Sequence, residues 1–287
     1  MDKDIRFSLI IGTLDRASVL EVCLNKLREQ TYKNFEIIVV DQSDNDETRD
    51  VINKFTDLDI RYIRSDIKGL SRARNIALSL MTCDYFCLVD DDADYREDYL
   101  EKASDILRKN PDVILSGFIK DTYLGSALVS YGEIRKKDDL SIREIIRLCP
   151  SAGLVIPATA VKKAGVFDED FGVGARFGST EESDFLLRCK RCGYKVIHTE
   201  DLYIEHPIVR SSEDIKPPMM PEKARLYSRG GGAFFKKHIK YMKEHDLIPL
   251  YIETYMKKLI KRIVANGDGC AKQQFAGFKE GYREYRQ

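Results

Sequence analysis

The chain has 287 residues, of which 43% are hydrophobic and 33% are charged, a composition typical of soluble globular proteins. Lys and Arg balance Asp and Glu at 47 each, so the overall charge gives no reason to expect a nucleic-acid partner. No stretch approaches the roughly 18 apolar residues of a membrane span, and the mixed charges at the start are unlike a signal peptide. Seven scattered cysteines indicate reduced thiols, and therefore a cytoplasmic location.

Strands and helices are predicted to alternate over the first 118 residues. The predicted strands 6–11, 35–40 and 85–89 are short apolar runs, and the predicted helix 17–30 repeats its apolar side chains at helical spacing. This alternation predicts an α/β fold, a parallel sheet with helices on both faces. The predicted strands are 6–11, 35–40, 60–63, 85–89 and 113–118, and the predicted helices are 17–30, 47–55, 69–80 and 97–109.

Three adjacent aspartates, Asp90, Asp91 and Asp92, follow the apolar run of the predicted strand 85–89. Open α/β sheets bind their ligands at the carboxyl ends of the strands. In an extended chain Asp90 and Asp92 point to one face and Asp91 to the other, and carboxylate oxygens are preferred by Mg²⁺ and Mn²⁺. The pattern predicts a divalent-cation site. The alternative is that the aspartates form a solvated acidic turn that caps the next helix.

Polar residues also follow the first two predicted strands, and the strand-end rule places them in the same crevice. Thr13 and Asp41 have the donors and acceptors that a nucleobase edge and ribose hydroxyls need, and Arg74 starts a helix from which it could reach a phosphate. The chain has no GxGxxG after its first strand and no GxxxxGK[ST], which argues against NAD-dependent oxidoreductases and P-loop enzymes. The candidate nucleotide-binding residues at these ends are Thr13, Asp15, Arg16, Asp41, Ser43 and Arg74.

The alternation ends after residue 120. Residues 121–150 are mixed in character, and a binding loop and a solvated face explain them equally well. Further strands are predicted at 152–156, 194–197 and 202–204, with a short helix over 157–165. His206 follows the last of these strands, where a metal ligand and a structural histidine are equally good interpretations.

A second acidic cluster, residues 181–184, opens a predicted helix that ends at Gly193. Acids at a helix N-terminus are stabilised by the helix dipole by ~0.3–1 kcal/mol each. That effect explains one or two of them, but it does not explain the glycine-rich stretch 172–178 just before. The cluster is therefore a candidate for catalysis, through Glu181, Glu182 or Asp184.

Prolines at 217, 218 and 221 predict a boundary between a catalytic domain, 1–215, and a basic helical region, 216–287. Residues 222–287 carry 15 Lys and Arg against seven Asp and Glu. A basic amphipathic helix there is typical of a segment that lies on a membrane surface; alternatively its apolar side packs onto the catalytic domain. The apolar stripe is formed by Ile248, Ile252, Met256, Leu259 and Ile263, beside Lys257, Lys258, Lys261 and Arg262.

Taken together, these features resemble the family 2 glycosyltransferases of GT-A fold, over about residues 5–206. The resemblance implies a GT-A type, Rossmann-like and mostly parallel sheet flanked by helices, with a helical C-terminal appendage. Five stretches in the family's order carry it: SLIIGTLDR (8–16), EIIVVDQSD (36–44), GLSRARNIAL (69–78), YFCLVDDDAD (85–94) and EESDFLLRCKRCGYKVI (181–197).

The resemblance also implies roles for the candidate residues. In the family the first two strand ends and the arginine-bearing helix hold the nucleoside diphosphate, and an Asp-x-Asp motif, matched here by Asp90 and Asp92, holds the ribose and the metal. Asp90 and Asp91 therefore join the six nucleotide-binding candidates. Asp92, with His206, corresponds to the ligands of a divalent cation, Mn or Mg. Glu182 stands where the family has its catalytic Asp, with Glu181 and Asp184 as alternatives. The first motif also departs from the family, with Gly12 and Leu14-Asp15 in place of Pro and an aromatic-Asn pair.

The implied function is transfer of a sugar, with inversion, from a nucleotide-sugar, in particular a UDP-sugar, to a hydroxyl of a saccharide or lipid-linked acceptor. Surface polysaccharide synthesis is the expected setting, with peripheral contact at the inner face of the membrane through 222–287. Two other classes remain as alternatives: a sugar-phosphate nucleotidyltransferase and a non-catalytic sugar-binding protein.

Overall fold

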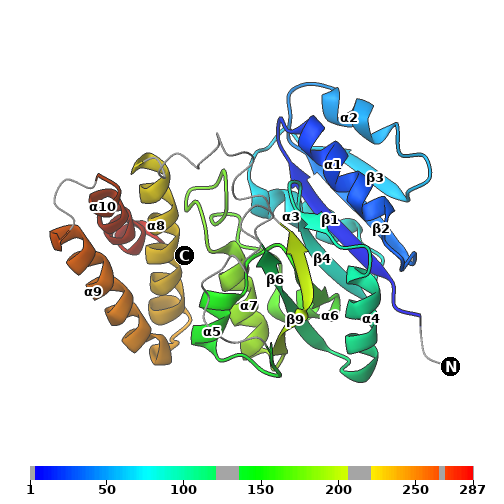
Figure 1. Ribbon diagram of the computed structural model, residues 1–287. Coiled ribbons are helices and arrows are strands. Elements are labelled where there is room, and N and C mark those ends of the chain that lie inside the picture. Colours follow the sequence, from blue (N-terminus) through cyan, green and yellow to red (C-terminus); the bar gives the residue numbers. More distant parts are fainter. Residues whose placement is uncertain (1–3, 121–135, 206–220, 265–268, 287) are drawn as a thin grey trace. The chain divides into compact units, whose positions relative to one another are not determined.

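The computed structural model describes residues 4–120, 136–205, 221–264 and 269–286 (Figure 1). The chain forms two compact units, each with its own internal packing. The first unit consists of Met1–Lys68, Arg72–Phe167 and Phe185–Glu213, and the second of Gly69–Ser71, Asp168–Asp184 and Asp214–Gln287.

Among the described residues, nine strands join into one mixed sheet in the first unit, in the order β3-β2-β1-β4-β8-β6-β9-β5, with β7 also paired to β9. Strands β1 to β4 run parallel wherever they pair, as does β6 with β9, whereas β8 lies antiparallel between β4 and β6. The strands are β1 (Phe7–Thr13), β2 (Phe35–Asp41), β3 (Ile60–Arg64), β4 (Tyr85–Asp90), β5 (Asp94–Tyr95), β6 (Val113–Lys120), β7 (Lys136–Lys137), β8 (Leu154–Pro157) and β9 (Lys195–Glu205).

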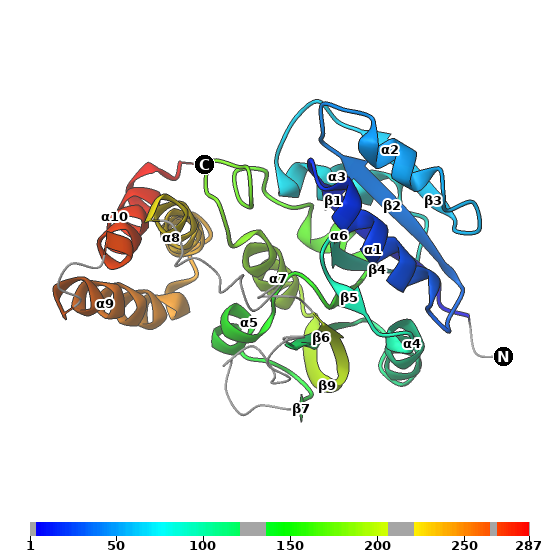
Figure 2. The same ribbon diagram turned by 45° about the horizontal axis from the view of Figure 1, so that its top comes forward.

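The central strands are buried on both faces, as their unbroken apolar runs predict. Leu9 of β1 packs into a core with helices α1, α2 and α4, whereas Ile10 faces the opposite core with α3, α5, α6 and the later part of α7 (Figure 2). The α/β class with helices on both faces is therefore confirmed. These helices are α1 (Ala17–Arg28), α2 (Glu47–Ile52), α3 (Leu70–Leu80), α4 (Tyr99–Lys109), α5 (Ile142–Leu148), α6 (Thr159–Ala164) and α7 (Glu181–Arg191).

Three elements after residue 120 differ from the sequence-based expectation, and the first is β7, a short strand in a stretch where none was predicted. The predicted strands 194–197 and 202–204 are parts of one strand, β9, because both halves pair with β6 across a register shift between Ser116 and Phe118. Helix α5 lies in a stretch that the sequence pattern left irregular. It begins with a capping box, in which the Ser141 side chain accepts from the amide of Glu144 and Glu144 accepts from the Ser141 amide.

The described part of the second unit is mainly helical: α8 (Pro221–Lys236), a π-helical segment η1 (Lys237–Tyr241), a short 3-10 turn η2 (His245–Leu247), α9 (Ile248–Val264) and α10 (Gly269–Glu284). Glycines bring the backbones of α8 and α10 close together: a Cβ atom on Gly281 would lie 1.9 Å from the Arg229 carbonyl oxygen. The predicted boundary prolines 217 and 218 lie outside the described residues, and Pro221 occupies the first position of α8. None of the described helices is long and apolar enough to cross a membrane.

Candidate active site

The carboxyl ends of β1, β2 and β4 lie side by side, because these strands are parallel neighbours. Thr13 is in register with Asp41, and Gly12 with Asp90. The residues that follow the strands therefore gather at one edge of the sheet, as the strand-end rule predicts.

Arg16 supplies positive charge to the run of three aspartates. One of its terminal nitrogens lies 2.6 Å from Oδ1 of Asp91 and the other 2.5 Å from Oδ2 of Asp92. The Thr13 hydroxyl donates a hydrogen bond of 2.8 Å to the second oxygen of Asp91. Asp91 is buried, and burial raises its pKa to about 6, although Arg16 and Thr13 act to lower it. Four of the predicted site residues, Thr13, Arg16, Asp91 and Asp92, thus form one polar cluster.

Asp90 is more open, with 30% of its side chain exposed. The Arg74 guanidinium lies 3.6 Å from its Oδ1, and the Ser151 hydroxyl donates to the same carboxylate at 3.3 Å. Arg74 is itself buried, and its guanidinium also lies 5.6 Å from the centroid of the Phe167 ring. Ser151 was not among the predicted site residues. It reaches Asp90 because it precedes β8, whose antiparallel insertion beside β4 carries no sequence signal.

Asp41 is fully buried, and both of its carboxylate oxygens accept hydrogen bonds within the first unit. Oδ1 accepts from the amide of Ser43 at 2.9 Å and Oδ2 from the Tyr62 hydroxyl at 2.9 Å. The Ser43 hydroxyl in turn accepts from the amide of Asp15 at 2.8 Å. Asp15 adopts a left-handed backbone, with φ of 53°, and its side chain is exposed. These hydrogen bonds connect the loops that follow β1 and β2. Tyr62 was not among the site residues predicted from the sequence.

The chemistry of the aspartates fits a divalent cation. Mg²⁺ is usually held by one or two carboxylates together with substrate phosphates and water, and the Asp90 and Asp92 carboxylates are both partly exposed. The described part of the chain has no group of three or more His, Cys, Asp or Glu placed to hold a metal by themselves. A cation held by these carboxylates would complete its coordination with oxygen atoms of substrate phosphates and water. The predicted ligand His206 lies outside the described residues.

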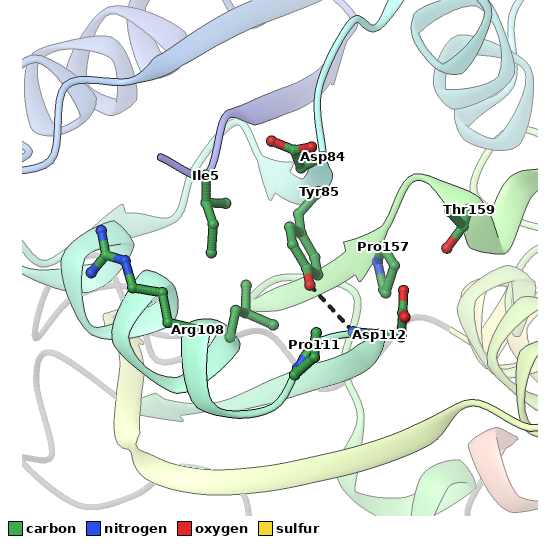
Figure 3. A pocket seen from close by; sticks show the side chains of 9 residues that line it. Ile5, Asp84, Tyr85, Arg108, Pro111, Asp112, Pro157 and Thr159 are labelled. Carbon is green, nitrogen blue, oxygen red and sulfur yellow. Dashed lines mark hydrogen bonds between the residues drawn. The ribbon is translucent and has the colours of Figure 1, made fainter. Parts of the chain in front are cut away.

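A separate hollow of about 350 Å³ lies at the other end of β4, where Tyr85 begins the strand (Figure 3). Asp84, Tyr85 and Asp112 line it, and the amide of Asp112 donates to the Tyr85 hydroxyl at 3.3 Å. Because these residues lie at the amino end of the strand, the hollow is distinct from the cluster around Asp91.

The second acidic cluster lies at the start of α7, and its residues differ in burial. Asp184 is fully buried, and its Oδ1 lies 2.7 Å from Nζ of Lys237 and 2.9 Å from Nε2 of His238. Glu181 is also buried and lies against Gly172: a Cβ atom added to Gly172 would lie 3.3 Å from the carboxyl carbon of Glu181. Glu182 alone of residues 181–184 is not buried. Neither Lys237 nor His238 was predicted here, since no sequence pattern links residues about 54 positions apart.

The loop before α7, which is part of the second unit, packs against the aromatic side chain of Tyr285. The Tyr285 ring centroid lies 5.6 Å from those of Phe171 and Phe177, and its hydroxyl donates to Asp168 at 3.3 Å. Gly172 and Gly174 in this loop have positive φ angles of 102° and 80°, which only glycine adopts without strain. The glycine-rich stretch is thus a tightly turned loop packed on Tyr285.

Solved structures share this fold over 99% of the chain. Residues 1–349 of TarS from S. aureus, solved with UDP-GlcNAc, match with a TM-score of 0.63 at 16% identity over 92% of that chain. The mannosyltransferase PcManGT from Pyrobaculum calidifontis, solved with GDP-Man and Mn²⁺, matches with a TM-score of 0.63 at 17% identity over 77% of that chain. The fold is that of GT-A glycosyltransferases, as the resemblance implied.

The sequence profile of glycosyl transferase family 2 matches residues 8–164, more than half of the chain. The chain belongs to this family.

Curated relatives agree with the family. Chondroitin synthase from Pasteurella multocida is 22% identical over 89% of this chain, and the amylovoran biosynthesis glycosyltransferase AmsB from Erwinia amylovora is 31% identical over 37% of it. Glycosyltransferase GlyA from Streptococcus pneumoniae is 35% identical over 34% of this chain. The matches span only 31%, 37% and 14%, respectively, of the lengths of these three relatives.

Proposed function

We propose that this glycosyltransferase moves a sugar from a UDP-sugar to a hydroxyl of a saccharide or lipid-linked acceptor, with inversion at the anomeric carbon, in the synthesis of a surface polysaccharide. The observation that carries the proposal is the cluster of Thr13, Arg16 and the three aspartates at the carboxyl ends of β1 and β4. The names of relatives support the setting, since AmsB is described as an amylovoran biosynthesis enzyme and TarS was solved with UDP-GlcNAc.

In this proposal the strand-end residues bind the donor. The loops after β1 and β2, with Asp15 and Ser43, hold the nucleoside, while Asp90 and Asp91 bind the sugar nucleotide. Arg16 and Arg74 keep the charges of the aspartates balanced before the donor arrives. Asp92 would hold a divalent cation, Mn or Mg, which when bound supplies a Lewis acid for the diphosphate.

Glu182 is the proposed catalytic base. It takes the proton of the acceptor hydroxyl while that oxygen bonds to the anomeric carbon and the bond from this carbon to the diphosphate oxygen breaks. The electron pair of the broken bond leaves with the nucleoside diphosphate, and a single displacement of this kind inverts the anomeric centre. Burial supports Glu182 over its neighbours, because Glu181 and Asp184 are both enclosed in the second unit.

A donor screen tests the proposal. Thermal unfolding is measured with UDP-, GDP- and dTDP-sugars, each with and without Mn²⁺, since a ligand at 100 times its Kd stabilises by ~2.7 kcal/mol. The stabilising donor is then incubated with candidate acceptors, and the product's anomeric configuration is determined by NMR. A product with the donor's own configuration contradicts inversion. Pyrophosphate release from a nucleoside triphosphate would indicate a nucleotidyltransferase, and binding without turnover a sugar-binding protein.

We also propose that residues 216–287 form a region that contacts an anionic membrane through α9. None of the α9 side chains is fully buried, and six apolar ones are exposed along the helix. Leu259, which the sequence placed in the apolar stripe, is half-buried instead. Lys257, on the same helix, has 73% of its side chain exposed, whereas Lys258 turns inward and donates to the Ser228 hydroxyl. Exposed apolar residues flanked by cations complement the anionic surface of a bilayer. The exposed stripe consists of Ile248, Ile252, Met256, Ile260, Ile263 and Val264.

A further inference from the structure

We infer that His238 is a positioning residue for the proposed base: as a cation bound between Asp184 and Glu244, it holds the first turn of the helix that carries Glu182. The inference rests on the proposed role of Glu182.

The geometry of the imidazole selects its charged form. His238 is fully buried in the π-helical segment η1, with Nε2 2.9 Å from Oδ1 of Asp184 and Nδ1 3.0 Å from Oε2 of Glu244. A neutral imidazole has one donor and one acceptor nitrogen, so it would leave one nitrogen lone pair facing a carboxylate oxygen. Only the imidazolium donates to both partners. Single π-helical turns of this kind are often found at functional sites.

The charges around the ring support the same form. Lys237 lies 2.7 Å from Asp184 and 2.8 Å from Asp168, and Asp168 also accepts from Tyr285. Lys237 thus bridges Asp168 and Asp184, and a proton on His238 adds a positive charge between Asp184 and Glu244. Burial acts to lower the pKa of His238, but the hydrogen bonds and charges of Asp184 and Glu244 outweigh it and raise the pKa above its ordinary value.

The network acts on the base through the helix. Asp184 lies two positions after Glu182, and its amide donates to the carbonyl of Thr180, which has a φ of 74°. Fixing the Asp184 carboxylate therefore fixes the turn from which Glu182 projects. Loss of the His238 proton leaves Asp184 and Glu244 repelling each other across a neutral ring, and it loosens that turn. A small misplacement of a catalytic group is enough to slow a reaction strongly.

The test is the kinetic pH profile of His238→Gln, whose side chain is similar in reach but has no charge. The wild-type kcat is expected to fall as the pH rises above 6.5 and through the raised pKa of His238. The variant is expected to lose this alkaline limb and about tenfold or more in kcat, with the donor KM unchanged, because Arg16 and Asp91 belong to the other unit. A variant with normal kcat and the same alkaline limb overturns the inference.

Two matched controls make the same substitution elsewhere. His198→Gln changes another buried histidine, whose Nδ1 faces the neutral Ser116 hydroxyl at 3.2 Å. His245→Gln changes an exposed histidine close to His238 in the chain. Both are expected to keep the wild-type kcat and its alkaline limb. Loss of the limb in His245→Gln would contradict the assignment to His238.

A measurement on the wild-type protein does not depend on how His238→Gln folds. The imidazole C–H resonances of the four histidines are titrated by NMR, and that of His238 is assigned by elimination with variants of the other three. His238 is expected to titrate above 6.5, whereas burial lowers the pKa of His198. A His238 pKa at or below 6.5 overturns the inference.

Glu182→Gln, assayed in parallel, separates the two proposals. If Glu182→Gln is inactive while His238→Gln has normal kcat and pH profile, the positioning role fails and the proposed base stands. If Glu182→Gln turns over normally, the proposed base fails, and with it the positioning role stated here, whatever the NMR titration shows.

Discussion

The guanidinium of Arg16 lies 2.6 Å from the carboxylate of Asp91, and the pKa of that carboxyl is nevertheless raised to about 6. Burial raises this pKa, and it outweighs the charge of Arg16 and the hydrogen bond from Thr13, which lower it. A close salt bridge therefore does not fully offset the desolvation of this aspartate. The folded protein holds the Asp91 proton more tightly than an unfolded chain does.

This relationship predicts how stability depends on pH. Because the folded-state pKa lies above the unfolded value, the stabilisation is fully present below about pH 4 and is lost as the pH rises through about 6. A shift from 3.8 to about 6 corresponds to about 3 kcal/mol. The free energy of unfolding is measured by urea titration between pH 4 and 7. Over this range it should fall by about 2 kcal/mol more in the wild type than in Asp91→Asn. Asp105→Asn, at an exposed position on α4, should keep the wild-type slope. Equal slopes in Asp91→Asn and wild type would contradict the prediction.

Asp92→Ala should abolish metal-dependent nucleotide binding, because it removes the carboxylate proposed to hold the cation. UDP binding is measured by calorimetry with and without Mn²⁺. The wild type should bind more tightly with Mn²⁺, whereas the variant should bind equally weakly in both conditions and unfold at the wild-type temperature. Asp105→Ala serves as the control and should retain the metal effect. Unchanged Mn²⁺ dependence in Asp92→Ala would remove this residue from the metal site.

Glu182→Gln keeps the shape of the side chain and removes its basicity. Turnover should fall by ~10²-fold or more, with the Kd for the donor nearly unchanged. The neighbouring acids should respond differently. Glu181→Gln should retain most turnover, and Asp184→Asn should also lower stability, because it weakens the contacts with Lys237 and His238. Normal turnover in Glu182→Gln together with loss in Glu181→Gln would transfer the catalytic role to Glu181.

Two glycines of the second unit should respond to alanine with opposite signs. A Cβ atom on Gly281 would lie 1.9 Å from the Arg229 carbonyl oxygen, so Gly281→Ala forces α8 and α10 apart and should cost about 3 kcal/mol. At Gly231 the nearest atom to an added Cβ is 3.8 Å away, in the ring of Phe278. Gly231→Ala should therefore stabilise the helix by about 0.5–1 kcal/mol. Denaturant unfolding compares the two variants, and equal effects would refute the close packing of α8 and α10.

Binding to vesicles tests the proposed membrane contact of α9. The full-length protein should co-sediment with anionic liposomes, less so as salt is added, and not with neutral ones. Changing Ile252, Met256 and Ile260 to Ser should weaken binding, as should reversing Lys257 and Lys261, since each cation contributes ~1 kcal/mol. As a control, Val22, Ile67 and Val166, which are also exposed apolar residues, are changed to Ser, and this variant should bind as the wild type does. Equal sedimentation with neutral and anionic vesicles, or with neither, would refute the membrane contact.

The first half of the fold could be predicted largely because β1, β2 and β4 are bounded apolar runs, whereas the two-residue strand β5 was missed. Side chains on both faces of these strands are buried, including Ile10 and Val40, so an unbroken apolar run shows where each strand begins and ends. The parallel order then follows from the alternation with helices. The gathering of Thr13, Arg16 and Asp91 follows from that order alone, without knowledge of any side-chain contact.

Other features depend on contacts that no local pattern records. Ser151 reaches Asp90 through the antiparallel insertion of β8, and the charge of His238 depends on Asp184, 54 positions earlier in the chain. Helix α5 is a different case, because its Ser141 and Glu144 form a capping box that sequence inspection could have found. The two predicted strands that merge in β9 show the reverse error. Residues 199–201 were expected to separate two strands, whereas they lie at a register shift within one strand.

The packing of Tyr285 on Phe171 and Phe177 also has a consequence for synthesis of the protein in the cell. The Tyr285 hydroxyl and its partner Asp168 are separated by 117 positions. At ~5–20 residues per second, a ribosome needs roughly 6–23 s to travel that distance. During this interval the segment before Glu182 has emerged without the aromatic side chain that completes its packing. The nascent chain can therefore assemble the strands that carry Asp91 well before the loop that leads to the proposed base has reached its final form.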